Sequence, residues 1–158
     1  MALRDFARSG RPLLGVCLGQ QLLMSESEEF GRTPGLGIVP GEVVRLDPGA
    51  RAGGRVHKVP FVGWNAIAKA KGGGDWNQSP LKGLPEGTQV YFVHSFHTRP
   101  DAAAHRLALT RYGAEEYCAA IGTGNVCGVQ FHPERSGAEG LRIYRNFAAM
   151  VRDAKVTA

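Results

Sequence analysis

The chain has 158 residues, with 19 Lys and Arg against 14 Asp and Glu, which gives a formal net charge of +5 at pH 7. Hydrophobic residues make up 43% and charged residues 21%, close to globular averages, which excludes a collagen-like, low-complexity or largely disordered chain. The basic side chains are scattered singly and do not alternate with aromatic residues. The excess charge therefore indicates a solvated surface or a partner-facing patch, and not a nucleic-acid-binding protein.

The three cysteines, Cys17, Cys118 and Cys127, are too few and too irregularly spaced for a disulfide framework. No cluster of His, Cys and Asp has the spacing of metal ligands, so we expect no metal. No apolar run approaches the ~18 residues that a membrane helix needs, and the N-terminus lacks the apolar core of a signal peptide. These features predict a soluble, cytoplasmic protein, and the length suits one domain over residues 1–158.

The start of the chain has the pattern of a strand, a sharp turn and a helix. A short helix over residues 3–8 ends at Ser9-Gly10, and the apolar run Leu13–Cys17 is typical of a buried strand. Apolar residues then fall near one face from Leu18 to Phe30, which predicts a second helix stopped by Gly31.

The rest of the chain is rich in short β-like runs bounded by Gly, Pro, Asp or Asn. They are Leu36–Val39, Glu42–Leu46, Gly63–Ala68, Gln89–Phe96, Arg106–Tyr112, Tyr117–Ile121 and Val126–Phe131. The glycine-rich stretch Lys71–Pro80 is a predicted surface loop, and Gly137–Val151 is a predicted amphipathic helix. This order of elements predicts a mixed α/β fold.

Gly15-Val16-Cys17-Leu18-Gly19 is the sulfur version of the G-x-S-x-G nucleophile elbow, and it lies between a predicted strand and a predicted helix. Small residues two positions to either side of Cys17 let the backbone turn without clashes. The start of the helix is expected to favour the thiolate, and the Leu18 N–H is the natural first oxyanion donor. The alternative is a buried structural cysteine between packing glycines, and the pentapeptide alone does not distinguish the two.

A cysteine nucleophile needs a base and a group that orients the base. His132 directly follows the predicted strand Val126–Phe131, which Pro133 ends. In an extended segment Glu134 points to the same side as His132, so it can accept the second ring N–H and fix the tautomer. The order Cys17, His132, Glu134 is compatible with a triad assembled in space.

These two motifs resemble those of the class I glutamine amidotransferases, whose triad is Cys, His and Glu. The finer similarity is to the glutaminase subunits of imidazole glycerol phosphate synthase. It is carried by Ser27-Glu28-Glu29-Phe30-Gly31, Gly35-Leu36-Gly37, Pro60-x-x-Gly63-Trp64-Asn65, Tyr91-Phe92-Val93-His94-Ser95 and Arg135-Ser136-Gly137. The resemblance covers nearly all of the chain, and it implies a three-layer, flavodoxin-like mixed sheet with a nucleophile elbow.

The resemblance also implies an activity. Cys17 would attack the side-chain amide of L-glutamine, and water would hydrolyse the resulting glutamyl thioester, so that glutamate and ammonia are formed. His132 would shuttle the proton, Glu134 would orient His132, and the Leu18 N–H would stabilise the oxyanion. Glutamine binding is implied for Gly19, Gln21, His94, Ser95 and Phe96. No cofactor is implied.

Members of this family pass the ammonia to a cyclase subunit of (β/α)8-barrel type. That subunit converts a phosphoribulosyl aminoimidazole carboxamide intermediate, PRFAR, to imidazole glycerol phosphate and AICAR in histidine biosynthesis. The resemblance therefore implies a heterodimer, with Trp64, Asn65 and Tyr91 at the boundary between its two proteins. Phe61 and His97 depart from the family pattern and are expected to bear on partner contacts.

The largest departure is at the start of the chain. Family members carry about one more βαβ portion before the helix that precedes the elbow, including a Gly-rich loop that supplies a second oxyanion donor. This chain is N-terminally short by comparison, which predicts a partial domain. Three interpretations stay open: a glutaminase for the cyclase, a glutaminase for another synthase partner, and a catalytically inactive truncated scaffold or binding module.

Overall fold

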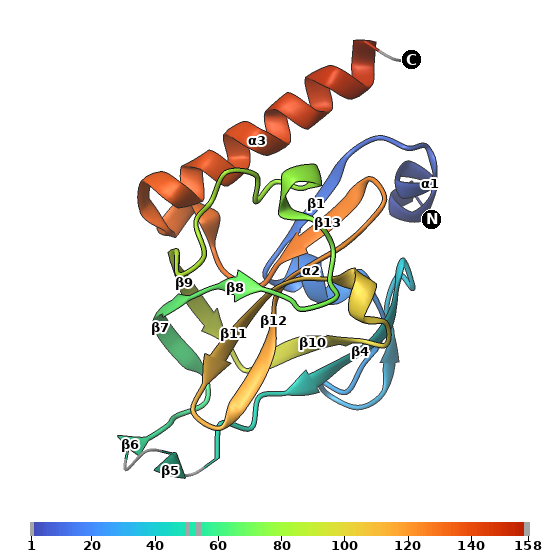
Figure 1. The fold of residues 1–158 in the computed structure, drawn as a ribbon. Coiled ribbons are helices and arrows are strands. Elements are labelled where there is room, and N and C mark those ends of the chain that lie inside the picture. Colours follow the sequence, from blue (N-terminus) through green and yellow to red (C-terminus); the bar gives the residue numbers. More distant parts are fainter. Residues whose placement is uncertain (1, 50, 53–54, 157–158) are drawn as a thin grey trace.

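A five-stranded sheet lies at the centre of the computed structural model, which describes residues 2–49, 51–52 and 55–156 (Figure 1). The strand order is β1, β13, β12, β11, β8; β1 and β13 are parallel, and the other neighbours are antiparallel. The bounds are Leu13–Val16 for β1, Val126–Val129 for β13, Glu115–Thr123 for β12, Arg106–Tyr112 for β11 and Ala68–Lys69 for β8. Within the described part of the chain, no strand pairs with the outer side of β1.

A second sheet has four strands in the order β10, β4, β2, β3. Their bounds are Phe96–Pro100 for β10, Val39–Arg45 for β4, Met24–Ser27 for β2 and Thr33–Pro34 for β3. Two antiparallel pairs accompany these sheets: β7 (Phe61–Ala66) with β9 (Gln89–His94), and β5 (Arg51–Ala52) with β6 (Arg55–Val56).

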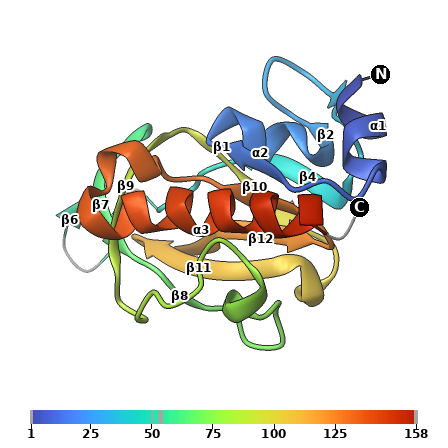
Figure 2. The same ribbon diagram turned by 90° about the horizontal axis from the view of Figure 1, so that it is seen from above.

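In the described ranges, three α-helices and three short 3₁₀ segments accompany the strands. The helices are α1 (Ala2–Arg8), α2 (Leu18–Leu22) and α3 (Gly137–Val156), and the 3₁₀ segments are η1 (Trp76–Gln78), η2 (Ala103–His105) and η3 (Pro133–Arg135). Figure 2 shows α3 lying across the central sheet. None of the described helices is both long enough and apolar enough to cross a membrane.

The central sheet separates two apolar cores. Because alternate side chains of a strand point to opposite faces, β12 supplies Tyr117 and Ala119 to one core and Cys118 to the other. The pairing of β12 with β11 shifts register between Cys118 and Ala120, and beyond this irregularity Ile121 belongs to the same core as Cys118. The first core also contains the fully buried Ile143, which anchors α3, and the second contains residues of β2 and β4. The mixed α/β fold predicted from the order of elements is confirmed.

The helix predicted over Leu18–Phe30 is wrong beyond its first turns. The helix α2 ends at Leu22, and Met24–Ser27 forms β2, which pairs in parallel with β4. Met24 is fully buried, whereas Phe30, expected on the buried helical face, is 99% exposed. Pairing with a strand more than a dozen residues away overrides the local helical spacing, which a short window of sequence does not reveal.

Three other expectations need smaller corrections. Residues 36–38 are not a strand, because their N–H groups donate to the backbone carbonyls of Leu22, Leu23 and Met24. The run predicted as one strand over Gln89–Phe96 is divided at Ser95 into β9 and β10. The loop predicted over Lys71–Pro80 contains η1, and its Trp76 is buried and donates its indole N–H to the Leu107 carbonyl at 2.6 Å.

Candidate active site

Cys17 occupies a strained backbone position between β1 and α2, with φ 52° and ψ −107°. A residue with a side chain adopts this conformation only where the surrounding structure enforces it, and such residues cluster at functional sites. The enforcing contact comes from Gly15, where a Cβ would lie 2.5 Å from the carbonyl carbon and oxygen of Gly19. A Cβ on Gly19 would meet open space, so only the first of the two elbow glycines is required by sterics.

The parallel pairing of β1 with β13 brings the second motif to the elbow. Val16 is in register with Val129, and the Cys17 N–H donates to the Val129 carbonyl at 2.8 Å. Cys17 and the chain leaving β13 therefore meet at the same edge of the sheet, the carboxyl end of both strands, where open α/β sheets place their binding sites.

His132 is held at this edge by its backbone as well as by its ring. Its N–H donates to the Tyr91 carbonyl at 2.9 Å, and its carbonyl accepts from the Ser136 hydroxyl at 2.6 Å. The ring Nδ1 lies 2.7 Å from Glu134 Oε1. A carboxylate accepts this bond, so Nδ1 carries the proton and Nε2 has the free lone pair of a base.

The Nε2 atom of His132 is buried and has no hydrogen-bond partner among the described residues. A buried polar atom without a partner is costly, so such an atom in a native structure calls for an explanation, and a role as proton acceptor is one. The predicted pairing of Glu134 with His132 is thus present in the structure.

The Cys17 thiol is flanked by two polar groups. Gln130 Nε2 lies 3.7 Å from Sγ, and Sγ lies 3.9 Å from the Val93 carbonyl, which accepts from the thiol. Burial raises the pKa of Cys17 above its ordinary value, and the charge on Glu134 raises this pKa further. Hydrogen bonds from the Leu18 N–H and from Gln130 lower the pKa, but burial has the larger effect. The Leu18 N–H at the start of α2 thus favours the thiolate as expected, but α2 is only five residues long and the desolvation of the sulfur has the larger effect.

Gln130 is a residue that the sequence motifs did not single out. It is fully buried beside Cys17, and its Oε1 accepts from Gln21 Nε2 at 3.2 Å. Gln21 Nε2 also donates to the Phe96 carbonyl at 2.9 Å. A polar residue inside the otherwise apolar run of residues 126–131 was the only sequence signal for this role.

His94 belongs to the segment 94–96 for which glutamine binding is implied, and its side chain lies in the interior. It is 6% exposed, with Nδ1 3.0 Å from the Phe96 carbonyl and Nε2 2.9 Å from the Tyr117 hydroxyl. Because the carbonyl only accepts, Nδ1 carries the proton and Nε2 accepts from Tyr117. Burial lowers the pKa of His94 to about 4. The ring is neutral and supports the backbone at Phe96, with no nitrogen free for a substrate.

A cavity of about 290 Å³ opens beside the elbow. Its lining combines the backbone turn after Cys17 with the segment that follows α2: Leu18, Gln21, Leu22, Ser27, Glu29, Phe30, Thr33, Pro34 and Gly35. Glu29 is half-buried there and is the only charged side chain among the described residues that line this cavity. Like Gln130, Glu29 has a candidate role that the sequence motifs did not indicate, although it lies within the quoted motif Ser27-Glu28-Glu29-Phe30-Gly31.

Residues 1–151 match the family model described as "Glutamine amidotransferase class-I". The chain belongs to the class I glutamine amidotransferases. It is 46% identical over 145 residues to "Imidazole glycerol phosphate synthase subunit HisH 1" of Legionella pneumophila strain Lens, covering 92% of this chain and 68% of that protein. It is 48% identical over 143 residues to the HisH subunit of Syntrophotalea carbinolica, covering 90% of this chain and 66% of the relative.

This amidotransferase also shares its fold with solved structures. A putative GMP synthase subunit from Thermoplasma acidophilum superposes with a TM-score of 0.60 at 20% identity, over 98% of this chain and 65% of the other. A glutamine amidotransferase of Thermotoga maritima gives a TM-score of 0.57 at 18% identity, over 98% of this chain and 54% of the other. The three-layer, flavodoxin-like class predicted for the chain agrees with these neighbours. The chain spans about two thirds of the length of the curated relatives described above.

The amidotransferase exposes an aromatic patch on β7 and β9, close to the His132 loop. Trp64 is 53% exposed and meets Tyr91 edge to face at 5.9 Å between ring centroids. The Arg135 guanidinium lies 4.5 Å from the centre of the Tyr91 ring. Asn65 is held beside them, because its Nδ2 donates to the Arg111 carbonyl at 2.6 Å.

Phe61 and His97, expected to bear on partner contacts, are instead buried. Phe61 stacks on Tyr112 at 4.1 Å between ring centroids, and His97 Nε2 lies 2.8 Å from Glu115 Oε1. Both belong to the interior packing of the amidotransferase. Within the described residues, no group of three or more His, Cys, Asp or Glu side chains is arranged to hold a metal ion.

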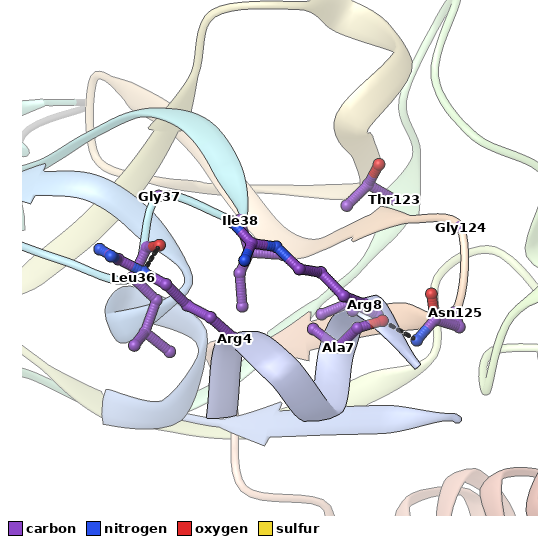
Figure 3. A pocket seen from close by; sticks show the side chains of 10 residues that line it. Arg4, Ala7, Arg8, Leu36, Gly37, Ile38, Thr123, Gly124 and Asn125 are labelled. Atoms are coloured by element: carbon purple, nitrogen blue, oxygen red, sulfur yellow. Dashed lines mark hydrogen bonds between the residues drawn. The ribbon is translucent and has the colours of Figure 1, made fainter. Parts of the chain in front are cut away.

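A second cavity, of about 550 Å³, lies between α1 and the turn before β13, away from Cys17 (Figure 3). Arg4 crosses it and donates to the Leu36 and Gly35 carbonyls at 2.6 and 3.0 Å, and Asn125 donates to the Ala7 carbonyl at 2.9 Å. The Arg4 bonds attach α1 to the loop whose Gly35 also lines the cavity beside the elbow, and the Asn125 bond attaches α1 to the turn before β13.

Proposed function

We propose that this chain is the glutaminase subunit of an imidazole glycerol phosphate synthase, with Cys17, His132 and Glu134 as its catalytic triad. The observation that carries the proposal is the Nε2 atom of His132, which is buried and has no hydrogen-bond partner among the residues that the structure describes. Glu134 fixes the tautomer of this ring by accepting from Nδ1 at 2.7 Å, and the segment leaves the sheet at the edge where Cys17 adopts its strained conformation. The high identity to HisH subunits supports the choice of pathway, histidine biosynthesis.

The raised pKa of Cys17 sets the first step. Because the thiol is protonated at rest, it transfers its proton to His132 Nε2 as the sulfur attacks the side-chain amide carbon of L-glutamine. The carbonyl oxygen becomes an oxyanion, and the backbone N–H of Leu18 is the donor placed to stabilise it. The imidazolium then donates its proton to the leaving nitrogen, so that ammonia departs and a glutamyl thioester remains.

Water hydrolyses the thioester in the second half of the reaction. His132 takes a proton from the water and returns it to Cys17 Sγ as the thioester bond breaks, and glutamate is released. Glu134 stays ionised throughout and stabilises the imidazolium. The partly desolvated sulfur makes this general base essential, since few thiolates are present without it.

The cavity beside the elbow is the proposed glutamine site. Gln21 lines it from α2, and the Phe96 carbonyl accepts hydrogen bonds from Gln21 and His94. Gly19, also on α2, is a further proposed binding residue. Ser95, at the turn between β9 and β10, completes the set of proposed binding residues. The Glu29 carboxylate is the proposed partner of the substrate's α-ammonium group, because a cation in a half-buried site needs an opposite charge.

We further propose that the ammonia passes to a cyclase subunit of (β/α)8-barrel type that binds the Trp64, Asn65 and Tyr91 patch. Exposed aromatic residues beside an arginine have the composition typical of interface centres. A cytoplasmic location fits the three free cysteines.

The test is glutamate release from L-glutamine, measured with and without the cyclase and its PRFAR ligand. Cys17→Ala should abolish release, and His132→Asn should lower it by at least ~10³-fold, because the nucleophile and base act as a unit. Cys118→Ala is the matched control, since burial raises the pKa of that thiol to about 11 and keeps it unreactive.

Unchanged release from Cys17→Ala would contradict the assigned nucleophile. Cysteine-dependent release that the cyclase does not stimulate would indicate a different synthase partner. No release from a folded wild-type chain in the presence of the cyclase would indicate an inactive scaffold.

A further inference from the structure

Both oxygens of the Glu134 carboxylate are engaged, and by different elements. Oε1 accepts from His132 Nδ1 at 2.7 Å, and Oε2 accepts from the Tyr144 hydroxyl at 3.1 Å. Tyr144 belongs to the second turn of α3. In the sequence its spacing suggested only an amphipathic core position.

The start of α3 is packed tightly on the segment that contains His132 and Glu134. At Gly140 a Cβ would lie 2.1 Å from the Pro133 carbonyl oxygen, and the Gly140 N–H donates to the Ser136 carbonyl at 3.1 Å. Because residues four apart share a helix face, Tyr144 lies one turn beyond Gly140 on the side that faces this segment. The neighbouring Ile143 is fully buried and prevents the helix from rotating.

We propose that Tyr144 is a positioning residue for the triad, which holds Glu134 Oε2 so that Oε1 stays on His132 Nδ1. The inference rests on the proposed glutaminase function. The side chain of Glu134 is 48% exposed, so water competes for its oxygens, and a carboxylate with one free oxygen can rotate away from the imidazole. A second fixed donor removes that freedom and keeps His132 Nε2 aimed at the site.

The charges around the carboxylate agree with this geometry. The pKa of Glu134 lies below its ordinary value, although partial burial by itself raises it. The pKa is lowered by hydrogen bonds from the backbone N–H of Glu134, from His132 and from Tyr144, and by the charge of His132. Burial and the contact with Glu134 raise the pKa of Tyr144, so its hydroxyl remains a donor. The charge of Glu134 also raises the pKa of Cys17, and the guanidinium of the adjacent Arg135 lies over the Tyr91 ring.

The test compares Tyr144→Phe, which removes only the hydroxyl, with Tyr112→Phe as the matched control. The Tyr112 hydroxyl donates to the Lys58 carbonyl at 3.1 Å, in a contact separate from the triad. With the cyclase present, Tyr144→Phe should lower kcat by about three- to tenfold with little change in KM, because the lost bond is to a charged group that does not touch substrate. Tyr112→Phe should leave kcat unchanged.

Two further readouts separate positioning from a structural effect. In a titration followed by the carbon signal of the Glu134 carboxyl, Tyr144→Phe should raise the pKa of Glu134. In a Glu134→Gln background the same substitution should have no further effect on kcat, since the tyrosine acts through the carboxylate. A wild-type kcat and Glu134 pKa in Tyr144→Phe, or an equal loss of rate in both backgrounds, would overturn the inference. If the wild type releases no glutamate, the proposed function fails, while the Glu134 titration still decides whether Tyr144 holds the carboxylate.

Discussion

Replacing Gly15 by alanine tests whether the elbow is built by a close approach of two backbones. The new Cβ would lie 2.5 Å from the Gly19 carbonyl carbon and oxygen and 2.9 Å from the Gln20 nitrogen, where 3.4 Å is the shortest ordinary contact. Relief requires α2 to move by roughly 1 Å, because the obstructing atoms are backbone and have no alternative rotamer.

The structure resists that movement on two sides. On one side, Gln20 of α2 is fully buried and donates to Thr98 Oγ1 at 2.8 Å. On the other, the Gln20 side chain already packs against Gly128, which is the strand partner of Gly15. We therefore expect a cost near the top of the range for overpacked cores, ~3 kcal/mol. With an m-value of ~2 kcal/mol/M, the urea midpoint should fall by about 1.5 M.

Gly19→Ala is the matched control, because its Cβ would meet open space within the short helix α2. Alanine there should leave the free energy of unfolding unchanged or raise it by at most ~1 kcal/mol of helix propensity, so the urea midpoint should rise by no more than ~0.5 M. The measurement is urea unfolding of both variants by circular dichroism. Equal midpoints for the two variants would refute the steric argument for Gly15.

The remaining predictions concern pH and the partner surface. Because burial holds the pKa of His94 at about 4 in the folded protein against an ordinary 6.5, the unfolded chain binds the proton more tightly between these values. Stability should therefore fall as the pH drops from 6.5 towards 4, by on the order of 3 kcal/mol, and urea unfolding of His94→Gln should show a weaker pH dependence. An unaltered pH dependence in that variant would contradict the neutral, buried ring. Trp64→Ala should change the free energy of unfolding by less than ~0.5 kcal/mol, since the side chain is 53% exposed, yet weaken cyclase binding by ~30-fold or more in a calorimetric titration. Phe30→Ala, which removes an exposed aromatic residue elsewhere, should bind the cyclase like the wild type, and equal affinities for all three proteins would exclude the proposed surface.

Local sequence patterns were sufficient to predict the features whose geometry is determined by residues close together in the chain. The elbow could be predicted because a sharp turn between strand and helix needs a small residue at position 15. The contact between His132 and Glu134 was predicted from an extended segment, but Glu134 lies in the 3₁₀ segment η3, which directly follows His132. The carboxylate still reaches the ring Nδ1, because only one residue separates the two. The family motifs lie in these same short segments.

Long-range contacts decided the features that the sequence did not reveal. The helix after Cys17 stops at Leu22 because the following residues pair with β4, and the pKa of the Cys17 thiol is raised because the folded chain desolvates it. Tyr144 reaches Glu134 only through the packing of α3 on the segment before it.

The sequence by itself therefore determined the fold class, the elbow and the identities of the proposed triad, since each depends on residue type and local spacing. The tertiary structure alone decided the support of that triad by Gln130 and Tyr144, and the burial of His94. Those roles depend on which distant segments the folded backbone brings into contact, and no local pattern of residues encodes such contacts.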